Sequence, residues 1–288
     1  MKPWSVPYPK FGAGDGLARV TAIAGRLGHD LTKFGAQAAV IVGSNGKGST
    51  ASMCASLLEQ AGGPVGLFTS PHLIDLNERF RIDGEDISDA ELGRHWSAVT
   101  KAARTEGLSD KLGGFEFLFL IAADWFAARG CAFTVWEAGL GGRLDPVRLI
   151  AARQLALTSL DLEHTALLGD TLEAIAREKI AAAPKGARLF FGESPLRACI
   201  EAQARAQGVQ AACVAPAPDA PFAGAHQRIN AALACALARA IAPLEDAQIK
   251  AGLAAARWPG RLEQLQADPL VIIDVGHTPG GVAAARAG

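Results

Sequence analysis

The sequence predicts an α/β fold: a three-layer, mostly parallel sheet that carries a phosphate-binding loop. Short β-branched runs alternate with longer helical patterns, and a glycine-rich turn with a single lysine follows the first of these runs. Polar motifs come directly after several of the other runs. Because ligands bind beyond the carboxyl ends of the strands in such sheets, these motifs are expected to form one site.

The spacing of apolar residues predicts the individual elements in order. Residues 14–30 form a helix, a strand with its loop covers 39–50, and a helix starts at 51. Ser88 is the expected N-cap of a helix over 88–106, with Glu91 three residues later. The other predicted elements are strands 65–70, 133–137, 154–159, 188–191 and 270–274, and helices 115–129, 171–183, 194–207, 226–241 and 246–256.

Composition narrows the class of function. The chain has 288 residues, half of them hydrophobic and 20% charged, with a net charge of −1. A charge near zero provides no general attraction for nucleic acid or an anionic membrane, and the few aromatic residues argue against single-strand binding. We therefore expect no nucleic-acid partner and no membrane partner. Small-molecule substrates and a monomer are further expectations for this chain.

The cysteines and the N-terminus indicate a cytoplasmic protein. The five cysteines lie far apart without C-x-x-C spacing, which favours reduced, buried thiols over disulfides or a zinc site. The first residues lack the apolar core of a signal peptide, and no later stretch has the length of a membrane span.

The segment from Val40 to Thr50, VIVGSNGKGST, is typical of a phosphate-binding loop. Its glycines let backbone N–H groups surround an anion at the start of a helix. Lys47 supplies a charge for the β- and γ-phosphates of ATP, and the Ser49 hydroxyl is placed to bind Mg²⁺. The expected nucleotide-binding residues are Gly43, Asn45, Gly46, Lys47, Gly48, Ser49 and Thr50. The loop is one residue shorter than the usual pattern and has an extra glycine after the lysine, so an ordinary strand–turn–helix connection remains the alternative.

Further motifs follow in order along almost the whole chain. They are FTSPHL at 68–73, NERFRI at 77–82, FEFL at 115–118, EAGLGGRLD at 137–145, DLEHT at 161–165, LGDTLEAIAREK at 168–179, HQ at 226–227 with Asn230, and WPGRLE at 258–263. Together with the phosphate loop they resemble the folylpolyglutamate synthase/dihydrofolate synthase family of the Mur-ligase superfamily. The resemblance implies the fold of the Mur-ligase central domain.

It also implies a chemistry: ATP phosphorylates a carboxylate, and an amine then displaces phosphate from the acyl phosphate. By this resemblance the catalytic residues are Lys47, Glu137, His164 and Lys179, and the metal ligands are Ser49, Ser70, Glu137 and His164. Oxygen-rich surroundings of this kind suit Mg²⁺ rather than zinc.

Structural alternatives exist for these residues. Ser70 could cap a turn before Pro71, and His164 could be a structural histidine. Lys179 matches a lysine that the family carbamylates, or it could be a solvated helix lysine paired with Glu178 or Glu173. Glu137 is harder to explain structurally, because an unpaired carboxylate at a buried strand end is costly.

The resemblance adds four residues to the nucleotide site: Asn230, Arg261, Asp274 and His277. The planar guanidinium of Arg261 suits a polyphosphate, with a surface ion pair to Glu263 as the alternative. Asp274 ends a strand and could hold the ribose hydroxyls.

The sequence departs from the family pattern in three places. The usual L-D-A-T-N reads Leu144-Asp145-Pro146-Val147-Arg148, and D-G-A-H-N reads Asp274-Val275-Gly276-His277-Thr278. The family's second domain is long, whereas this sequence stops at Gly288. We expect an ATP-binding domain over 1–257, a junction and the start of a second domain over 258–288, and a strand 270–274 whose sheet partners are missing.

These features predict an ATP-dependent ligase that joins a folate-type carboxylate, dihydropteroate or a folyl γ-carboxylate, to L-glutamate. Two alternatives remain: the same chemistry on a non-folate acid, or a non-catalytic ATP-binding module.

Overall fold

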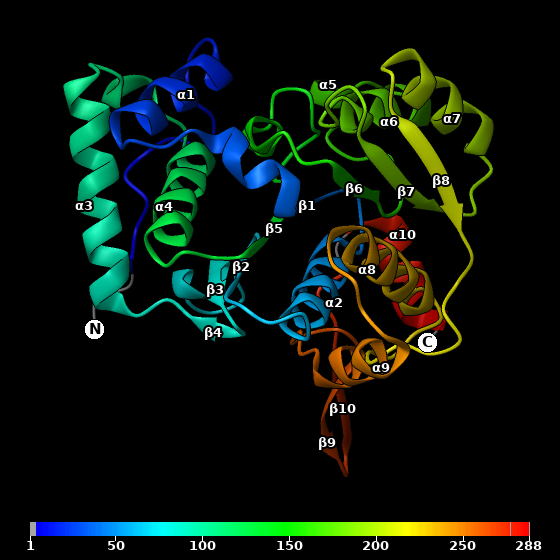
Figure 1. Cartoon of the computed structure of the whole chain (residues 1–288). Coiled ribbons are helices and arrows are strands. Elements are labelled where there is room, and N and C mark those ends of the chain that lie inside the picture. Colours follow the sequence, from blue (N-terminus) through cyan, green and yellow to red (C-terminus); the bar gives the residue numbers. More distant parts are fainter. Residues whose placement is uncertain (1–3, 277, 288) are drawn as a thin grey trace.

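The computed structural model describes residues 4–276 and 278–287. Its main sheet has eight strands in the order β4-β3-β2-β5-β1-β6-β7-β8 (Figure 1). The strands from β2 to β8 in this order run parallel, and β3 and β4 add an antiparallel edge. The strands are β1 (Ala38–Val42), β2 (Val65–Phe68), β3 (Phe80–Ile82), β4 (Glu85–Asp86), β5 (Phe133–Glu137), β6 (Gln154–Leu157), β7 (Arg188–Gly192) and β8 (Gln210–Val214).

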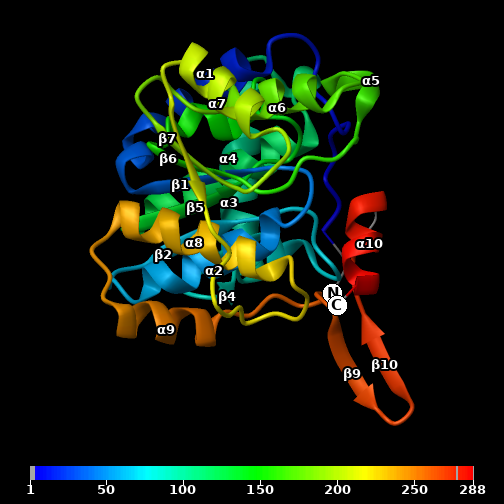
Figure 2. The same ribbon diagram turned by 90° about the vertical axis from the view of Figure 1, so that its right-hand side faces the viewer.

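Helices cover both faces of this sheet, which confirms the predicted three-layer α/β fold (Figures 1 and 2). One face packs against α1 (Gly16–Arg26), α3 (Asp89–Thr105), α4 (Gly114–Ala128), α6 (Leu172–Ile180) and α7 (Arg197–Ala206). The other packs against α2 (Lys47–Glu59), α8 (Gln227–Ile241) and α9 (Asp246–Ala255). Two further helices are α5 (Thr165–Leu168) and α10 (Pro279–Ala287).

Strand β1 lies inside the sheet between β5 and β6, and all five of its residues are buried. This explains its continuous apolar run, because neither face meets water. The predicted cap of α3 is also confirmed: the Ser88 side chain accepts a hydrogen bond from the Glu91 N–H. Helix α2 starts at Lys47 rather than at 51, since Gly46 adopts a left-handed conformation that ends the turn there.

Four strands were not predicted from the sequence. β3 and β4 have three and two residues, too few to show an alternating pattern. β8 is an edge strand that contains two alanines and has no fully buried residue. The fourth, β9 (Glu263–Ala267), is exposed throughout and has no buried side that would mark its sequence as a strand.

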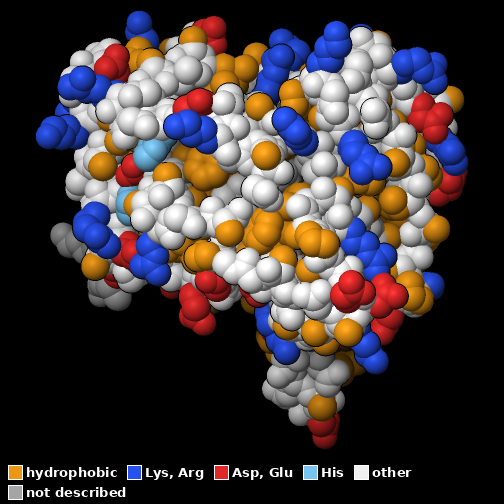
Figure 3. Space-filling view, viewed as in Figure 1, with side chains coloured by type: hydrophobic (Ala, Val, Ile, Leu, Met, Phe, Trp, Pro, Cys, Tyr) orange, Lys and Arg blue, Asp and Glu red, His pale blue; other side chains and the backbone are white. Residues whose placement is uncertain are grey.

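β9 corrects the expectation about the final strand. β10 (Leu270–Ile273) does have a partner in this chain, because it pairs antiparallel with β9 in a separate two-stranded sheet. This hairpin stands out from the body of the molecule (Figures 1 and 3). Leu270 and Ile272 remain 63% and 50% exposed. The domain boundary after residue 257 stays a prediction.

All five cysteines are free thiols, as expected, although only Cys54 is buried and the other four are partly buried. None of the helices within the described ranges has the length and apolar character to cross a membrane.

The last residue of α2, Glu59, yields a test of pH-dependent stability. Burial, with a smaller contribution from the nearby Asp83 carboxylate, raises the pKa of Glu59 to about 7. The folded chain therefore holds this proton to a higher pH than the unfolded chain, and stability falls as the pH rises from the ordinary value of 4.5 towards 7. Glu59→Gln should raise the melting temperature at pH 8, and the gain should shrink as the pH approaches 5.

Thermal unfolding of both proteins between pH 5 and pH 8.5 measures this gap. Glu106→Gln, which removes an exposed carboxylate at the end of α3, is the matched control. A difference in melting temperature that does not depend on pH, or one that the control variant also shows, would contradict the burial of the Glu59 carboxyl group.

Candidate active site

The phosphate loop leaves the carboxyl end of β1, and its glycines are required by neighbours from other elements. Gly43 and Gly46 have φ angles of +145° and +85°, in the region that favours glycine. A Cβ on Gly46 would lie 2.6 Å from the Asn230 Oδ1 atom of α8. A Cβ on Gly48 would lie 2.8 Å from the indole Nε1 atom of Trp258. The extra glycine after the lysine is therefore a packing requirement.

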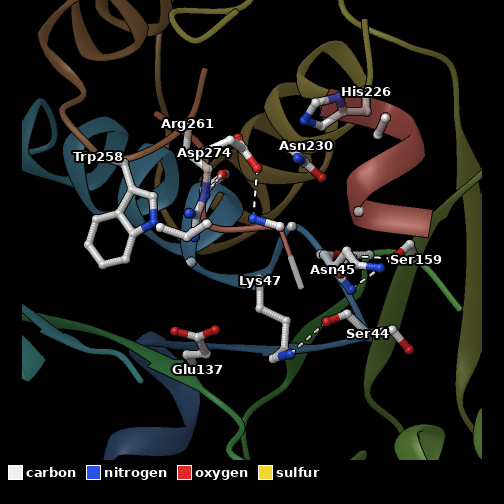
Figure 4. Close-up of a pocket in the computed structure, with 18 of the residues that line it drawn as sticks. Ser44, Asn45, Lys47, Glu137, Ser159, His226, Asn230, Trp258, Arg261 and Asp274 are labelled. Atoms are coloured by element: carbon white, nitrogen blue, oxygen red, sulfur yellow. Dashed lines mark hydrogen bonds between the residues drawn. The ribbon is translucent and has the colours of Figure 1, made fainter. Parts of the chain in front are cut away.

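Lys47 is the first residue of α2, and its ammonium group turns back onto the loop (Figure 4). Its Nζ atom donates to the carbonyl oxygens of Gly43 and Ser44, at 3.0 and 3.1 Å. The loop is held on its other side by Ser159, whose Oγ atom accepts a hydrogen bond from the Asn45 N–H at 2.9 Å. A cation is thus held where the loop and the N-terminus of α2 meet.

A cavity of about 560 Å³ opens over this loop, a volume that suits a small-molecule ligand. It brings together most of the residues predicted from the sequence. They are Asn45, Gly46, Lys47, Gly48, Ser49, Ser70, Glu137, His164, Asn230, Arg261 and Asp274. Figure 4 shows Lys47 and Glu137 below Trp258, Arg261 and Asp274, with Asn230 and His226 to one side.

Glu137 ends β5 and is 4% exposed. Its Oε2 atom accepts a hydrogen bond from the Ser70 N–H at 3.0 Å, so the two predicted metal ligands are neighbours. Burial raises the pKa of this carboxyl group, while Lys47, the Ser70 N–H, Arg261 and Arg79 act in the opposite direction. A buried carboxylate surrounded by cations suits a site that holds a metal or a phosphate.

Ser49 is fully buried, and its hydroxyl receives two long hydrogen bonds. They come from the Arg261 Nε atom at 3.3 Å and from the Gln227 Nε2 atom at 3.4 Å. Arg261 thus reaches the phosphate loop, and the alternative ion pair with Glu263 is wrong. Glu263 instead accepts a hydrogen bond from the Gly260 N–H at 2.7 Å.

Lys179 lies beneath the loop and outside the cavity wall. It is 2% exposed, and its Nζ atom donates to the Glu163 Oε1 atom at 2.7 Å and to the Gly43 carbonyl at 2.9 Å. Burial and the neighbouring Lys47 lower the pKa of Lys179, with Glu163 opposing. Because Lys179 is buried and pairs with Glu163, the alternative of a solvated lysine paired with Glu178 or Glu173 is wrong. Glu178 instead pairs with Arg143.

The remaining predicted residues differ in their surroundings. His164 is exposed with φ of +46°, and its side chain makes no recorded hydrogen bond to another described residue. The Asp274 carboxylate accepts the N–H groups of Leu262 and Gly276, at 3.0 and 2.7 Å. Thr50 is buried in α2, and within the described ranges its hydroxyl has no partner. His277 lies outside the described residues.

The two departures from the family motifs have structural explanations. Asp145 accepts the N–H groups of Gly139, Leu140 and Val147, and burial raises its pKa to about 6. Pro146 then fits the first position of a 3₁₀ turn, where no N–H is needed.

Thr278 replaces the second asparagine. Its hydroxyl donates to the Asn45 Oδ1 atom at 2.9 Å and accepts from the Gly281 N–H at 3.0 Å. It therefore ties α10 to the phosphate loop.

Sequence reasoning assigned no role to several residues of the cavity wall. They are Arg81, Ser159, Asp161, Glu163, His226, Gln227 and Trp258. Most stand inside the conserved-looking motifs already quoted, which was the available signal. Some of their contacts could not be assigned because the partners are distant in the sequence, such as Ser49 for Gln227 and Asn45 for Ser159.

Comparisons with known proteins identify similar proteins, although no family model matches the chain. The chain is 34% identical to the dihydrofolate synthase/folylpolyglutamate synthase of Bacillus subtilis, over 98% of this chain and 73% of that protein. It is also 34% identical to a probable bifunctional folylpolyglutamate synthase/dihydropteroate synthase of Halobacterium salinarum, over 96% of this chain. It spans only 37% of that protein and 32% of a similar one from Haloferax volcanii.

Solved structures are similar throughout the chain. An FPGS–AMPPCP–folate complex superposes with a TM-score of 0.89 at 30% identity, covering 96% of this chain and 76% of that one. Escherichia coli FolC in complex with DHPP and ADP has a TM-score of 0.85 at 29% identity, covering 96% and 70%.

The contact between Gly48 and Trp258 yields a stability test. Gly48→Ala should lower the free energy of unfolding by about 1–3 kcal/mol, because the added methyl group overpacks against the indole ring. Combining it with Trp258→Ala should recover part of that loss, so the two changes should be non-additive.

Urea unfolding of the single and double variants measures the coupling. Gly25→Ala is the matched control, since it lies in α1 with nothing within 4 Å of its added Cβ and should not destabilise. If the effects of Gly48→Ala and Trp258→Ala on the free energy of unfolding are additive, the backbone of Gly48 does not pack against the Trp258 indole.

Proposed function

The chain belongs to the folylpolyglutamate synthase/dihydrofolate synthase family, and on this premise we propose that it is an ATP-dependent ligase. It joins a folate-type carboxylate, dihydropteroate or a folyl γ-carboxylate, to L-glutamate through an acyl phosphate. The observation that carries this proposal is the convergence of Lys47, Ser49, Glu137 and Arg261 on one cavity over the phosphate loop.

Two cations from distant parts of the chain support ATP as the energy source. Lys47 comes from the loop itself, and Arg261 reaches the same helix N-terminus from the segment before β9. Backbone N–H groups at the start of α2 add a partial positive charge. This set suits the β- and γ-phosphates, and structures of relatives hold AMPPCP or ADP.

The residues present also fit Mg²⁺. Among the described residues no group of three or more His, Cys, Asp or Glu side chains is arranged to hold a metal. Mg²⁺ commonly combines one or two protein oxygens with water and phosphate oxygens, and hydroxyl oxygens are suitable ligands. Ser49 offers a buried hydroxyl with only long hydrogen bonds. The Ser70 N–H donates to the Oε2 atom of Glu137. The Oε1 atom accepts no hydrogen bond from a described residue and can therefore serve as a metal ligand. Ser70 and His164 complete the proposed ligands, and the bound metal would offset charge on the transferring phosphoryl group.

In the proposed reaction an oxygen of the acid carboxylate attacks the γ-phosphorus, and ADP leaves. Lys47 and Arg261 stabilise the negative charge that is redistributed over the phosphates. The glutamate amine then attacks the acyl carbon, inorganic phosphate leaves with the C–O bond electrons, and the amine gives up a proton. Lys179 pairs with Glu163 and donates to the Gly43 carbonyl, and it is proposed to hold the phosphate loop in position for this reaction.

A different acid substrate is the second candidate. It is favoured by Arg148, which stands where the family has asparagine and is exposed, with its Nη1 atom donating to the Arg143 carbonyl at 3.0 Å. An added guanidinium near the glycine-rich loop would suit an acid with an extra negative charge.

Turnover tests the proposal. The chain is mixed with ATP, Mg²⁺, L-glutamate and dihydropteroate, and ADP release and product mass are followed. ADP formation should require both acid and amine, and Lys47→Ala should lower kcat by about 100-fold or more, because a charge that acts on the transferring phosphoryl group is lost.

Lys101→Ala, an exposed lysine on α3, is the matched control and should keep full turnover. ATP binding without acid-dependent ADP release would exclude catalysis by this chain and leave an ATP-binding module. Turnover with another acid but with no folate would select the second candidate.

A further inference from the structure

The loop between β2 and β3, residues 69–79, carries Ser70 and is closed at three levels. At its base the Thr69 N–H donates to the Arg79 carbonyl at 3.1 Å. Above this the Arg79 Nε atom donates to the His72 Nδ1 atom at 2.9 Å. The third closure is made by Glu78 alone.

The Glu78 carboxylate collects three consecutive backbone N–H groups. Oε2 accepts from Leu73 at 2.7 Å, and Oε1 accepts from Ile74 and Asp75 at 2.8 and 2.7 Å. Burial works against the charged form, but these three donors outweigh it and lower the pKa of Glu78. Hydrogen bonds to a charged acceptor are stronger than neutral ones, so this group holds the loop tightly.

The closed loop reaches the active site at two points. Near its start, the Ser70 N–H donates to the Glu137 carboxylate. At its tip, Leu73 and Glu78 line the cavity wall, and Leu73 lies near Gly260 of the segment that carries Arg261. The neighbouring Ile74 is 84% exposed, so burial does not hold the tip in place, whereas Leu76 further along the loop is buried in the core. The shape of the tip at residues 73–75 therefore depends on the hydrogen bonds to Glu78.

We propose that Glu78 is a positioning residue: by gathering the three N–H groups of residues 73–75 it fixes the loop that sets Ser70 against Glu137. This rests on the proposed function, in which these two residues serve the metal. In this proposal Glu78 acts through the loop, because its carboxylate oxygens are taken up by the three backbone N–H groups.

Glutamine cannot replace this carboxylate. It keeps one acceptor oxygen, but its amide NH₂ would face a backbone N–H that needs an acceptor. Glu78→Gln therefore retains the size of the side chain and removes at least one of its three hydrogen bonds to residues 73–75.

The first measurement is amide hydrogen exchange of the peptide that spans residues 71–79. Exchange should be slow in the wild-type chain and at least about tenfold faster in Glu78→Gln, because a hydrogen bond to a charged group is lost. Glu85→Gln, on the exposed strand β4 of the same edge, is the matched control and should leave exchange unchanged.

The second measurement is the binding of Mn²⁺ and of AMPPCP. In Glu78→Gln the affinity for Mn²⁺ in the presence of AMPPCP should fall by about tenfold, as is common when a group that orients metal ligands is lost. The affinity for AMPPCP at the phosphate loop should change little, because the loop of Glu78 does not include residues 43–50.

The outcomes separate the two proposals. Faster exchange with unchanged Mn²⁺ affinity would make Glu78 merely structural and overturn the positioning role, as would an equal loss of Mn²⁺ and AMPPCP affinity. A wild-type chain that binds neither ligand would instead overturn the proposed function, while the exchange experiment would still show whether Glu78 closes the loop.

Discussion

The structure depends on the close approach of three other elements to the backbone of the phosphate loop. Thr158 after β6, Asn230 on α8 and Trp258 beyond α9 occupy the spaces where Gly43, Gly46 and Gly48 have no side chains. An anion-binding loop works only if its N–H groups stay fixed and unobstructed. Here they are fixed from outside, by side chains that also form the cavity walls.

Three of the buried charged residues lie near the phosphate loop, whereas the buried Arg19 pairs with Glu116 elsewhere. Glu137, Asp145 and Lys179 are each at most 4% exposed, and all three lie close enough to Lys47 for its charge to affect them. A buried charge is tolerated only with partners, and each has them: a backbone N–H for Glu137, three for Asp145, and Glu163 for Lys179. The phosphate loop with Lys47, the two carboxylates Glu137 and Asp145, and Lys179 therefore interact electrostatically as one group.

Two segments outside the parallel sheet complete this group. The closed loop at 69–79 follows β2 and contacts Glu137 through the Ser70 N–H. The segment with Trp258 and Arg261 follows α9 and contacts Ser49 through the Arg261 side chain. Helix α10 adds a third contact, because Thr278 and Gly280 bond to Asn45 and Asp161. The segment after α9 therefore supplies part of the cavity wall.

The sequence by itself determined the layered α/β fold, the phosphate loop and the identity of most residues around the cavity. These features depend on residues that are close together in the sequence. A buried parallel strand appears as an apolar run, and the start of a helix is marked by its capping residue, such as Ser88. The resemblance between motifs then placed Glu137, Asn230 and Arg261 in one site.

Only the tertiary structure decided what each residue touches. The need for glycine at 48 comes from Trp258, and the partner of Lys179 is Glu163 rather than a neighbour on its own helix. The exposed strand β9 carries no buried pattern, so its pairing with β10 could not be predicted. The contacts of Gly48 and Lys179 join different segments of the chain, and packing and charge pairing between such segments leave no periodic signal in the sequence.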